Sequence, residues 1–224
     1  MDVFTPQPVE AHTRGATGSV SLIIGPMFSG KTTELIRRVR VALAAGRQCC
    51  VVRPERDTRW VGGDVHTHHS AGGKSTVVSG MNCQQRGFRH DEAPIVTVSS
   101  LVGAVDRLAG YDVVAVDEGQ FVEDLAQGCD GLAARGVHVV VAALNGTYAR
   151  TPFPAVSELY PACERVTMLR AVCMVCRERD APFSVLYRES PEPPADGSEG
   201  ASPGNFVNIG GGDKYMAVCR ACLP

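Results

Sequence analysis

The sequence has no apolar run close to the roughly 20 residues that a membrane-spanning helix needs. Its first 18 residues do not combine a basic segment with a following apolar segment, as a secretory signal would. The charges nearly cancel to a net −2, so broad electrostatic attraction to nucleic acid or to an anionic membrane is not expected. We therefore expect a cytoplasmic protein that binds its ligands in a local site.

Cysteine is present in an odd number, nine, which does not suit a framework of paired disulfides. A chain of 224 residues is also long enough to bury a core without such crosslinks. We expect a reducing compartment, with some of the cysteines on a metal.

The chain divides into three parts. Residues 1–18, rich in Pro, Thr and Gly, are expected to form a flexible tail, and residues 19–169 alternate apolar strand patterns with helix patterns. Residues 170–224 form a second, small domain, inside which the Pro-, Gly-, Ser- and acid-rich segment 190–204 is expected to be a disordered loop. The predicted strands are 19–25, 47–53, 94–98, 111–118, 137–143 and 164–169, and the predicted helices are 32–45, 99–109 and 121–135, with Ser99 or Ser100 as a cap. This order predicts an α/β fold with a parallel sheet.

A phosphate-binding motif follows the first predicted strand. The segment GPMFSGKT matches G-x-x-x-x-G-K-[ST] and precedes a predicted helix, which is the context that the motif requires. Its backbone N–H groups would surround phosphates, its lysine would reach the β- and γ-phosphates, and its threonine would ligate Mg²⁺. The predicted ATP and Mg²⁺ site comprises Gly25, Met27, Phe28, Ser29, Gly30, Lys31, Thr32, Thr33 and Asp117.

Two acids, Asp117 and Glu118, end the apolar strand predicted at 111–118. A carboxylate at the carboxyl edge of a parallel strand beside a P-loop suits a Mg²⁺ ligand. Because side chains alternate faces along a strand, the neighbouring acid could instead take a proton from a nucleophile. The other interpretation of Glu118 is a solvated acid at a strand end.

Two C-x-x-C pairs lie near the C-terminus, at Cys173 and Cys176 and at Cys219 and Cys222. Four thiolates in this spacing predict one closed, tetrahedral site for structural Zn²⁺, without an open position for catalysis. The alternative is redox-active or simply buried cysteines. Cys49, Cys50, Cys83, Cys129 and Cys163 show no pairing pattern and are expected to be core or surface thiols.

The motifs together resemble those of the cytosolic-type (type II) thymidine kinases. The resemblance runs from residue 19 to the C-terminus and rests on GPMFSGKTT at 25–33, DTR at 57–59, DEGQF at 117–121, LNGTYARTPF at 144–153 and the two cysteine pairs. It implies a RecA-like P-loop domain with a zinc-containing lasso domain, usually assembled as a homotetramer. It also implies Mg·ATP as donor, deoxythymidine and often deoxyuridine as acceptor, and dTTP as a feedback inhibitor.

The resemblance further implies roles for individual residues. Glu118 resembles the general base for the 5′-hydroxyl, Asp57 a carboxylate near the nucleoside and metal, and Arg59 a positive group near the transferred phosphate. Residues expected around thymine and the sugar, through apolar side chains or through lasso backbone groups, are Met27, Phe121, Leu144, Tyr148, Phe153, Ser184, Phe206, Asn208, Ile209, Gly210 and Tyr215.

The chain departs from the family pattern in several places. The family usually reads LDGT where this chain has Asn145 in LNGT, Tyr148 stands where Phe is common, and Trp60 where Tyr is common. The stretch after Cys176 is one residue longer than usual, which affects the alignment at Ser184.

Two other functions compete with nucleoside phosphorylation. One is a P-loop ATPase whose zinc ribbon binds single-stranded nucleic acid, but acids offset the basic residues of 170–224 and leave no basic stripe. The other is a deoxynucleoside monophosphate kinase, which would need extra arginines for the acceptor's phosphate. The prediction is a thymidine kinase that produces dTMP for nucleotide salvage and has no nucleic-acid or membrane partner.

Overall fold

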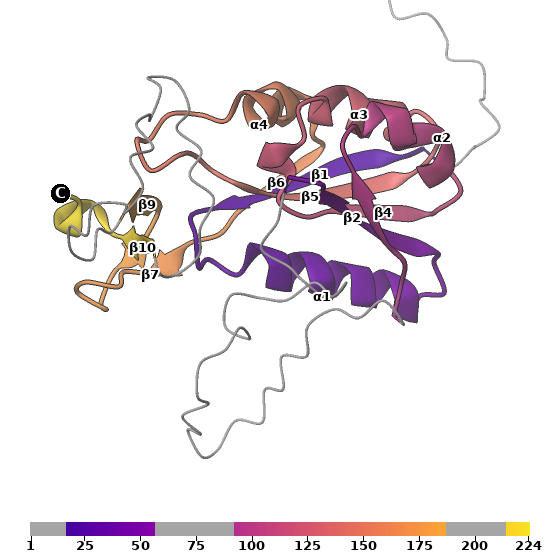
Figure 1. Ribbon diagram of the computed structural model, residues 1–224. Coiled ribbons are helices and arrows are strands. Elements are labelled where there is room, and N and C mark those ends of the chain that lie inside the picture. Colours follow the sequence, from indigo (N-terminus) through magenta and orange to yellow (C-terminus); the bar gives the residue numbers. More distant parts are fainter. Residues whose placement is uncertain (1–16, 57–91, 187–213) are drawn as a thin grey trace, which may run out of the picture.

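A computed structural model describes residues 17–56, 92–186 and 214–224, and the structural statements below concern these residues (Figure 1). Three of the predicted features lie outside them wholly or almost wholly: the tail, the DTR segment and the loop 190–204. The division into domains at residues 169 and 170 stays a prediction.

A six-stranded parallel sheet forms the centre of the described structure (Figure 1). Its strand order is β3-β2-β4-β5-β1-β6, so the first strand lies between two strands from much later in the chain. Ser19 of β1 is in register with His138 of β5, and Ser21 of β1 with Arg165 of β6. The strands are β1 (Ser19–Gly25), β2 (Cys49–Pro54), β3 (Ile95–Val98), β4 (Val113–Val116), β5 (His138–Leu144) and β6 (Arg165–Met168). The predicted parallel α/β fold is confirmed.

Helices cover both faces of this sheet (Figure 1). Helix α1 (Lys31–Ala44) packs on one face through Leu35, Ile36 and Val39, which follow the expected helical spacing. On the other face lie α2 (Val105–Leu108), α3 (Leu125–Ala133) and α4 (Pro154–Leu159), with the 3-10 turns η1 (Val102–Ala104), η2 (Gly119–Phe121) and η3 (Tyr160–Ala162). Strand β4 is buried on both faces, as its continuous apolar run predicts.

Two of the predicted helices differ most from the structure, and α4 has no counterpart among the predicted helices. The stretch predicted as one helix at 99–109 is η1 followed by the short α2, and Ser100 Oγ accepts the N–H of Gly103 as a cap would. The helix predicted to begin at Phe121 begins at Leu125. Asp124, just before it, accepts hydrogen bonds from the backbone N–H groups of Leu101 and Val102. Residues 119–121 form the separate 3-10 turn η2, and α3 starts only after Asp124.

A smaller unit, called the cysteine region here, comprises the described residues 171–186 and 214–224. It contains the antiparallel pairs β7 (Ala171–Val172) with β8 (Asp180–Ala181) and β9 (Phe183–Leu186) with β10 (Tyr215–Val218), then the turn η4 (Arg220–Cys222). Its own apolar cluster includes Cys173 and Cys219. Phe28, which lies in the loop between β1 and α1, packs against this cluster. The cysteine region therefore sits beside the loop that follows β1 (Figure 1).

Within the described residues, none of the helices has the length and apolar character needed to cross a bilayer.

Candidate active site

The loop between β1 and α1, called the glycine loop here, spans residues 25–30 and turns sharply. Gly25 has no room for a side chain, because a Cβ would lie 2.5 Å from Ser29 Oγ and 2.7 Å from the carbonyl oxygen of Leu169. Gly30 has a φ of 81°, which glycine adopts without strain, and Phe28 has the same positive sign at 64°. The two glycines of the motif thus allow the backbone to make this turn, and the loop leads directly into the N-terminus of α1.

Two side chains, one from the glycine loop and one from the first turn of α1, bond to the backbone of the glycine loop. Ser29 Oγ and Lys31 Nζ both donate to the carbonyl oxygen of Pro26, at 2.8 Å and 2.7 Å. The ammonium group of Lys31 is therefore held at the loop, where the motif expects it to meet phosphates. Thr33 follows in the same turn of α1 and is half-buried.

Thr32 and Asp117 come together from distant parts of the sequence. The hydroxyl of Thr32 donates to Asp117, with its oxygen 3.1 Å from Oδ1 and 3.3 Å from Oδ2. Asp117 directly follows β4, its side chain is buried, and its N–H bonds to the carbonyl oxygen of Val52 in β2. A hydroxyl and a carboxylate oxygen at this distance match the oxygen ligands that Mg²⁺ takes beside a nucleotide, so these residues fit the predicted metal.

Glu118 leaves the strand in an unusual conformation. Its φ and ψ are 51° and 42°, in the left-handed region that non-glycine residues seldom adopt. The next residue, Gly119, packs so closely that a Cβ would lie 2.6 Å from Val141 Cγ1. A left-handed turn, and not strand alternation, therefore sets the backbone conformation at Glu118. The two acids do have different partners: Asp117 bonds to Thr32, and Glu118 accepts a hydrogen bond from Gln120 Nε2.

Most of the residues expected around thymine lie near this edge of the sheet. Met27, Phe153 and Tyr215 are buried, while Phe121, Leu144 and Tyr148 are half-buried. The rings of Tyr148 and Tyr215 meet across the two units, with centroids 6.3 Å apart and planes tilted by 42°. A hollow of about 360 Å³ beside Phe121 is lined by Glu55, Arg56, Val98, Ser99, Phe121 and Glu123, at the carboxyl ends of β2 and β3. Asp57, Arg59, Phe206, Asn208, Ile209 and Gly210 lie outside the described residues.

Ser184 joins the cysteine region to the glycine loop. Its Oγ accepts the backbone N–H of Met27 at 2.9 Å, and both residues are buried. A second link is Asn145 just after β5, whose Nδ2 donates to the carbonyl oxygen of Pro182 at 3.1 Å. The hydroxyl oxygen of Ser184 thus accepts a bond from the protein itself, and the backbone groups of this residue are the candidates for contact with a nucleoside.

The four cysteines of the C-x-x-C pairs form one cluster. Their sulfur atoms all lie within 4.8 Å of one another, and Cys176 Sγ and Cys219 Sγ are 4.0 Å apart. Tetrahedral Zn²⁺ with Zn–S bonds of about 2.3 Å needs sulfur atoms about 3.8 Å apart, so the cluster fits this ion. Burial alone would raise the pKa of the Cys173 thiol, but backbone N–H groups of Cys176 and Cys219 point at its sulfur and help to lower the pKa to about 6. A thiolate at this position is the form that binds a metal.

The remaining described cysteines lie outside this cluster. Cys49, Cys50 and Cys129 are buried and Cys163 is half-buried. Burial raises the pKa of Cys50 and of Cys163 to about 11 and that of Cys129 further still. They are therefore unreactive thiols of the core, as the lack of a pairing pattern suggested.

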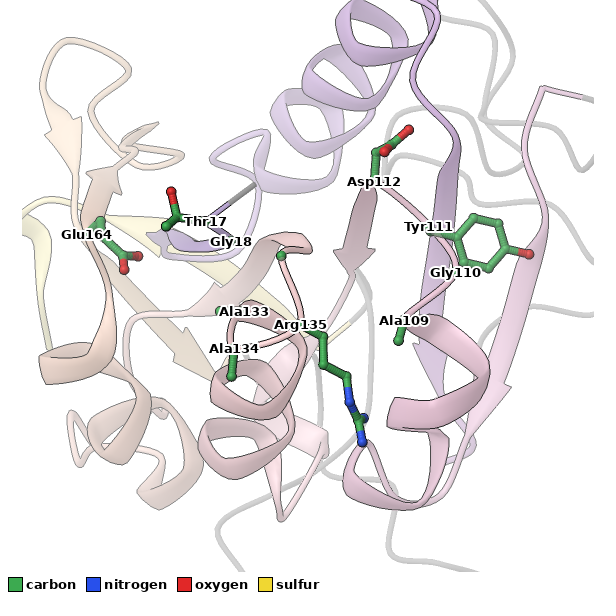
Figure 2. A pocket seen from close by; sticks show the side chains of 11 residues that line it. Thr17, Gly18, Ala109, Gly110, Tyr111, Asp112, Ala133, Ala134, Arg135 and Glu164 are labelled. Carbon is green, nitrogen blue, oxygen red and sulfur yellow. The ribbon is translucent and has the colours of Figure 1, made fainter. Parts of the chain in front are cut away.

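A larger hollow of about 790 Å³ lies at the opposite edge of the sheet (Figure 2). Its lining includes Tyr111 and Asp112 before β4, Arg135 after α3 and Glu164 before β6. These positions lie at the amino ends of the strands. The carboxylate of Glu164 accepts the N–H of Val20 at 2.6 Å, and Arg135 pairs with Asp106 at 2.8 Å. None of the residues predicted from the motifs lines it, and ligands of parallel α/β sheets bind at the carboxyl ends. The candidate site is therefore the carboxyl edge that carries the glycine loop.

Comparison with known proteins agrees with this arrangement. A family model described as "Thymidine kinase" matches residues 18–223, which include the glycine loop, both acids and all four clustered cysteines. The chain belongs to the thymidine kinase family. Among its relatives is "Thymidine kinase 1" of Dictyostelium discoideum, 37% identical over 205 residues that cover 92% of this chain and 77% of that protein. The "Thymidine kinase" of Sheeppox virus is 35% identical and that of Raccoon poxvirus 37% identical, each over 92% of this chain and 96% of its own length.

Membership of the thymidine kinase family confirms the resemblance that the motifs predicted. It does not favour the alternative of an ATPase with a zinc ribbon for nucleic acid. Sequence reasoning missed the side chain of Gln120, which lies inside the DEGQF motif yet received no role of its own. The signal was available, since a polar residue two positions after an acid at a strand end can turn back toward that acid.

Proposed function

We propose that this protein transfers the γ-phosphate of ATP to the 5′-hydroxyl of deoxythymidine, and of deoxyuridine, giving dTMP in nucleotide salvage. The family match carries the proposal, because it spans residues 18–223 and so includes every part of the candidate site. The contact between Thr32 and Asp117 supports it independently, since it joins a P-loop threonine to an acid at a neighbouring strand end.

The donor nucleotide is held by the glycine loop and the first turn of α1. Backbone N–H groups of residues 27–33 and the positive end of the helix dipole would surround the phosphates, and Lys31 would neutralise charge on the β- and γ-phosphates. Thr32 and Asp117 would hold Mg²⁺, which neutralises charge that develops on the phosphates. Arg59 would add a positive group near the transferred phosphate, and Asp57 would lie near the nucleoside and the metal.

Glu118 is the proposed general base. The hydroxyl proton of the nucleoside passes to its carboxylate while the 5′-oxygen forms a bond to the γ-phosphorus. The bond from that phosphorus to the bridging oxygen of the β-phosphate breaks, and ADP leaves with the electron pair. Phosphoryl transfer depends mainly on positioning and charge neutralisation, and the acceptor's proton still needs a destination.

The nucleoside is proposed to lie between the sheet edge and the cysteine region. Met27, Phe121, Leu144, Tyr148, Phe153 and Tyr215 would form its apolar walls, and backbone groups near Ser184 and at Phe206, Asn208, Ile209 and Gly210 would bond the base and sugar. A cytosine would place a donor where an acceptor is wanted and leave buried groups unpaired. A purine would be too large.

Zn²⁺ on Cys173, Cys176, Cys219 and Cys222 is proposed to be structural, since four thiolates close its coordination. We further propose a homotetramer and inhibition by dTTP as end product, both of which the type II resemblance implies, and a cytoplasmic location, which the cysteine content favours. Light scattering on purified protein tests the assembly, and titration of dTTP against initial rates tests the inhibition.

The experiment that tests the function is an ADP-release assay across a panel of acceptors. Release should require thymidine or deoxyuridine and should stay at background with deoxycytidine, deoxyadenosine or dTMP. Stimulation by single-stranded DNA in place of thymidine would identify an ATPase and overturn the proposal. Stimulation by dTMP alone would identify a monophosphate kinase.

A further inference from the structure

Gln120 links Glu118 to the end of strand β5. It lies in the turn η2 with only 7% of its surface exposed. Its Oε1 accepts the backbone N–H of Leu144 at 3.1 Å, and its Nε2 donates to Glu118 Oε2 at 2.5 Å. One buried amide thus connects the proposed base to the sheet.

The orientation of this amide is set by the group at its other end. A backbone N–H can only donate, so the amide group that faces Leu144 must be the oxygen. The NH₂ group therefore faces Glu118 and can only donate to it. A donor on one carboxylate oxygen fixes the plane of the carboxylate, and a general base must face the proton that it takes.

The backbone between the two residues brings them together. Glu118 has a φ of 51°, which reverses the chain after β4, and Gly119 fits against Val141 only because it has no side chain. The reversal places residue 120 next to the carboxylate of residue 118. A left-handed conformation at a non-glycine residue persists only where its surroundings hold it, and the two bonds of Gln120 do so.

We propose that Gln120 is the positioning residue of the base: its amide, which also bonds to Leu144, fixes the direction of the Glu118 carboxylate while the 5′-hydroxyl gives up its proton. The inference rests on the proposed function, because it takes Glu118 as the base. An ionised carboxylate has about four acceptor positions, so the bond from Gln120 leaves it able to accept that proton. Gln120 itself neither touches the nucleoside nor moves a proton.

The test replaces Gln120 with residues that differ in what they offer Glu118. Gln120→Leu removes both hydrogen bonds, whereas Gln120→Glu keeps the size of the side chain and an oxygen for the N–H of Leu144 but has no NH₂ group for Glu118. The deciding measurement is made in two backgrounds, the parent and Glu118→Gln, because a residue that acts only through the base has nothing to position once the base is gone.

In the parent background, kcat of Gln120→Leu and of Gln120→Glu should fall by about 10-fold to 100-fold, the usual effect of losing a residue that orients an active-site group. In the Glu118→Gln background, the same two changes should lower the remaining kcat by less than about threefold. KM for thymidine should change by less than about twofold in all of these variants, because the nucleoside contacts are intact.

Controls separate this inference from the function on which it rests. Gln127→Glu makes the same replacement at an exposed position of α3 and should leave kcat unchanged in both backgrounds. If Glu118→Gln keeps full turnover, the assignment of the base is wrong. If Glu118→Gln lowers kcat while Gln120→Glu lowers kcat equally in both backgrounds, the positioning role is wrong and the base assignment stands. Should Gln120→Leu fail to fold, Gln120→Glu alone decides.

Discussion

The hydroxyl of Ser184 accepts a hydrogen bond from the backbone N–H of Met27, at 2.9 Å. The first residue belongs to β9 of the cysteine region and the second to the glycine loop, 157 positions earlier in the chain. The ring of Phe28 packs on the same region. The glycine loop, which is proposed to hold the phosphates, is therefore held in place by the cysteine region, which is proposed to hold the zinc.

Replacing Ser184 with Ala should destabilise the protein, because it removes the hydrogen bond to Met27. The N–H of Met27 would stay buried without an acceptor, which costs about 1–3 kcal/mol. For Ser184→Ala we expect a lower midpoint of thermal unfolding and a higher KM for ATP. Ser184→Thr keeps the hydroxyl, so both changes should be smaller in that variant. Ser157→Ala, at an exposed position of α4, is the matched control. Equal midpoints for Ser184→Ala and Ser157→Ala would refute the role of this bond.

Asn145 provides a second test of the same junction. Its amide donates to the carbonyl oxygen of Pro182, and an aspartate, which the family usually has here, could not donate. Asn145→Asp should destabilise this protein by about 1–2 kcal/mol, because a carboxylate would face a carbonyl oxygen. Asn145→Ala should cost less than Asn145→Asp, since it removes the bond without adding a repulsion. Chemical denaturation of the three proteins measures this order, and the reverse order would speak against the contact.

Glu118→Gln tests the proposed base directly. The change keeps the shape of the side chain and removes its ability to take a proton, so kcat should fall by a factor on the order of 10²–10⁴. Binding of ATP and thymidine, measured by calorimetry, should change little because neither contact depends on that proton. Glu158→Gln, exposed on α4, should behave as the parent. Near-normal turnover in Glu118→Gln would exclude Glu118 as the general base and make Asp57 the next candidate to test.

Asp117→Asn should act on the metal instead of the proton. Its carboxylate bonds to the hydroxyl of Thr32, and both are proposed Mg²⁺ ligands. An amide oxygen carries less charge, so the Mg²⁺ concentration needed for half-maximal rate should rise on the order of tenfold. Initial rates over a Mg²⁺ titration measure it, with Asp130→Asn on the exposed side of α3 as control. An unchanged Mg²⁺ requirement in Asp117→Asn would exclude this residue as a ligand.

Removal of one thiol should release the proposed zinc. Elemental analysis should find about one zinc per chain in the parent and far less in Cys219→Ser, because a four-thiolate site needs all its ligands. Thermal stability should fall with the metal content. Cys163→Ser removes a half-buried thiol outside the cluster and should keep its zinc. A parent protein purified without chelators yet free of zinc would contradict the proposal.

The sequence predicted best those parts whose geometry is local. The strand at 19–25 and the Gly-x₄-Gly-Lys-Thr spacing each follow from a continuous pattern of neighbouring residues, and β1 spans the same residues as predicted. The pairing of the four cysteines into one cluster also followed from spacing, because each C-x-x-C turn brings its own two sulfur atoms together.

The parts that sequence reasoning missed depend on contacts between distant segments or on a rare backbone angle. The late start of α3 reflects the bonds that Asp124 makes to Leu101 and Val102, residues more than twenty positions earlier. The left-handed conformation of Glu118 is one that few non-glycine residues adopt, so no pattern of apolar and polar residues reveals it. The use of the Ser184 hydroxyl by Met27 could only be seen once the two units were placed together.

The place of β1 in the sheet has a consequence for how the protein is made. This strand is synthesised before the other described strands, yet its two neighbours are β5 and β6, which end at Leu144 and Met168. Its backbone groups can find their partners only after the chain has been synthesised as far as Met168, and closing such distant contacts is slow. The glycine loop, although it follows the first described strand, is therefore completed late, and nascent chains cut short before β6 should bind no nucleotide.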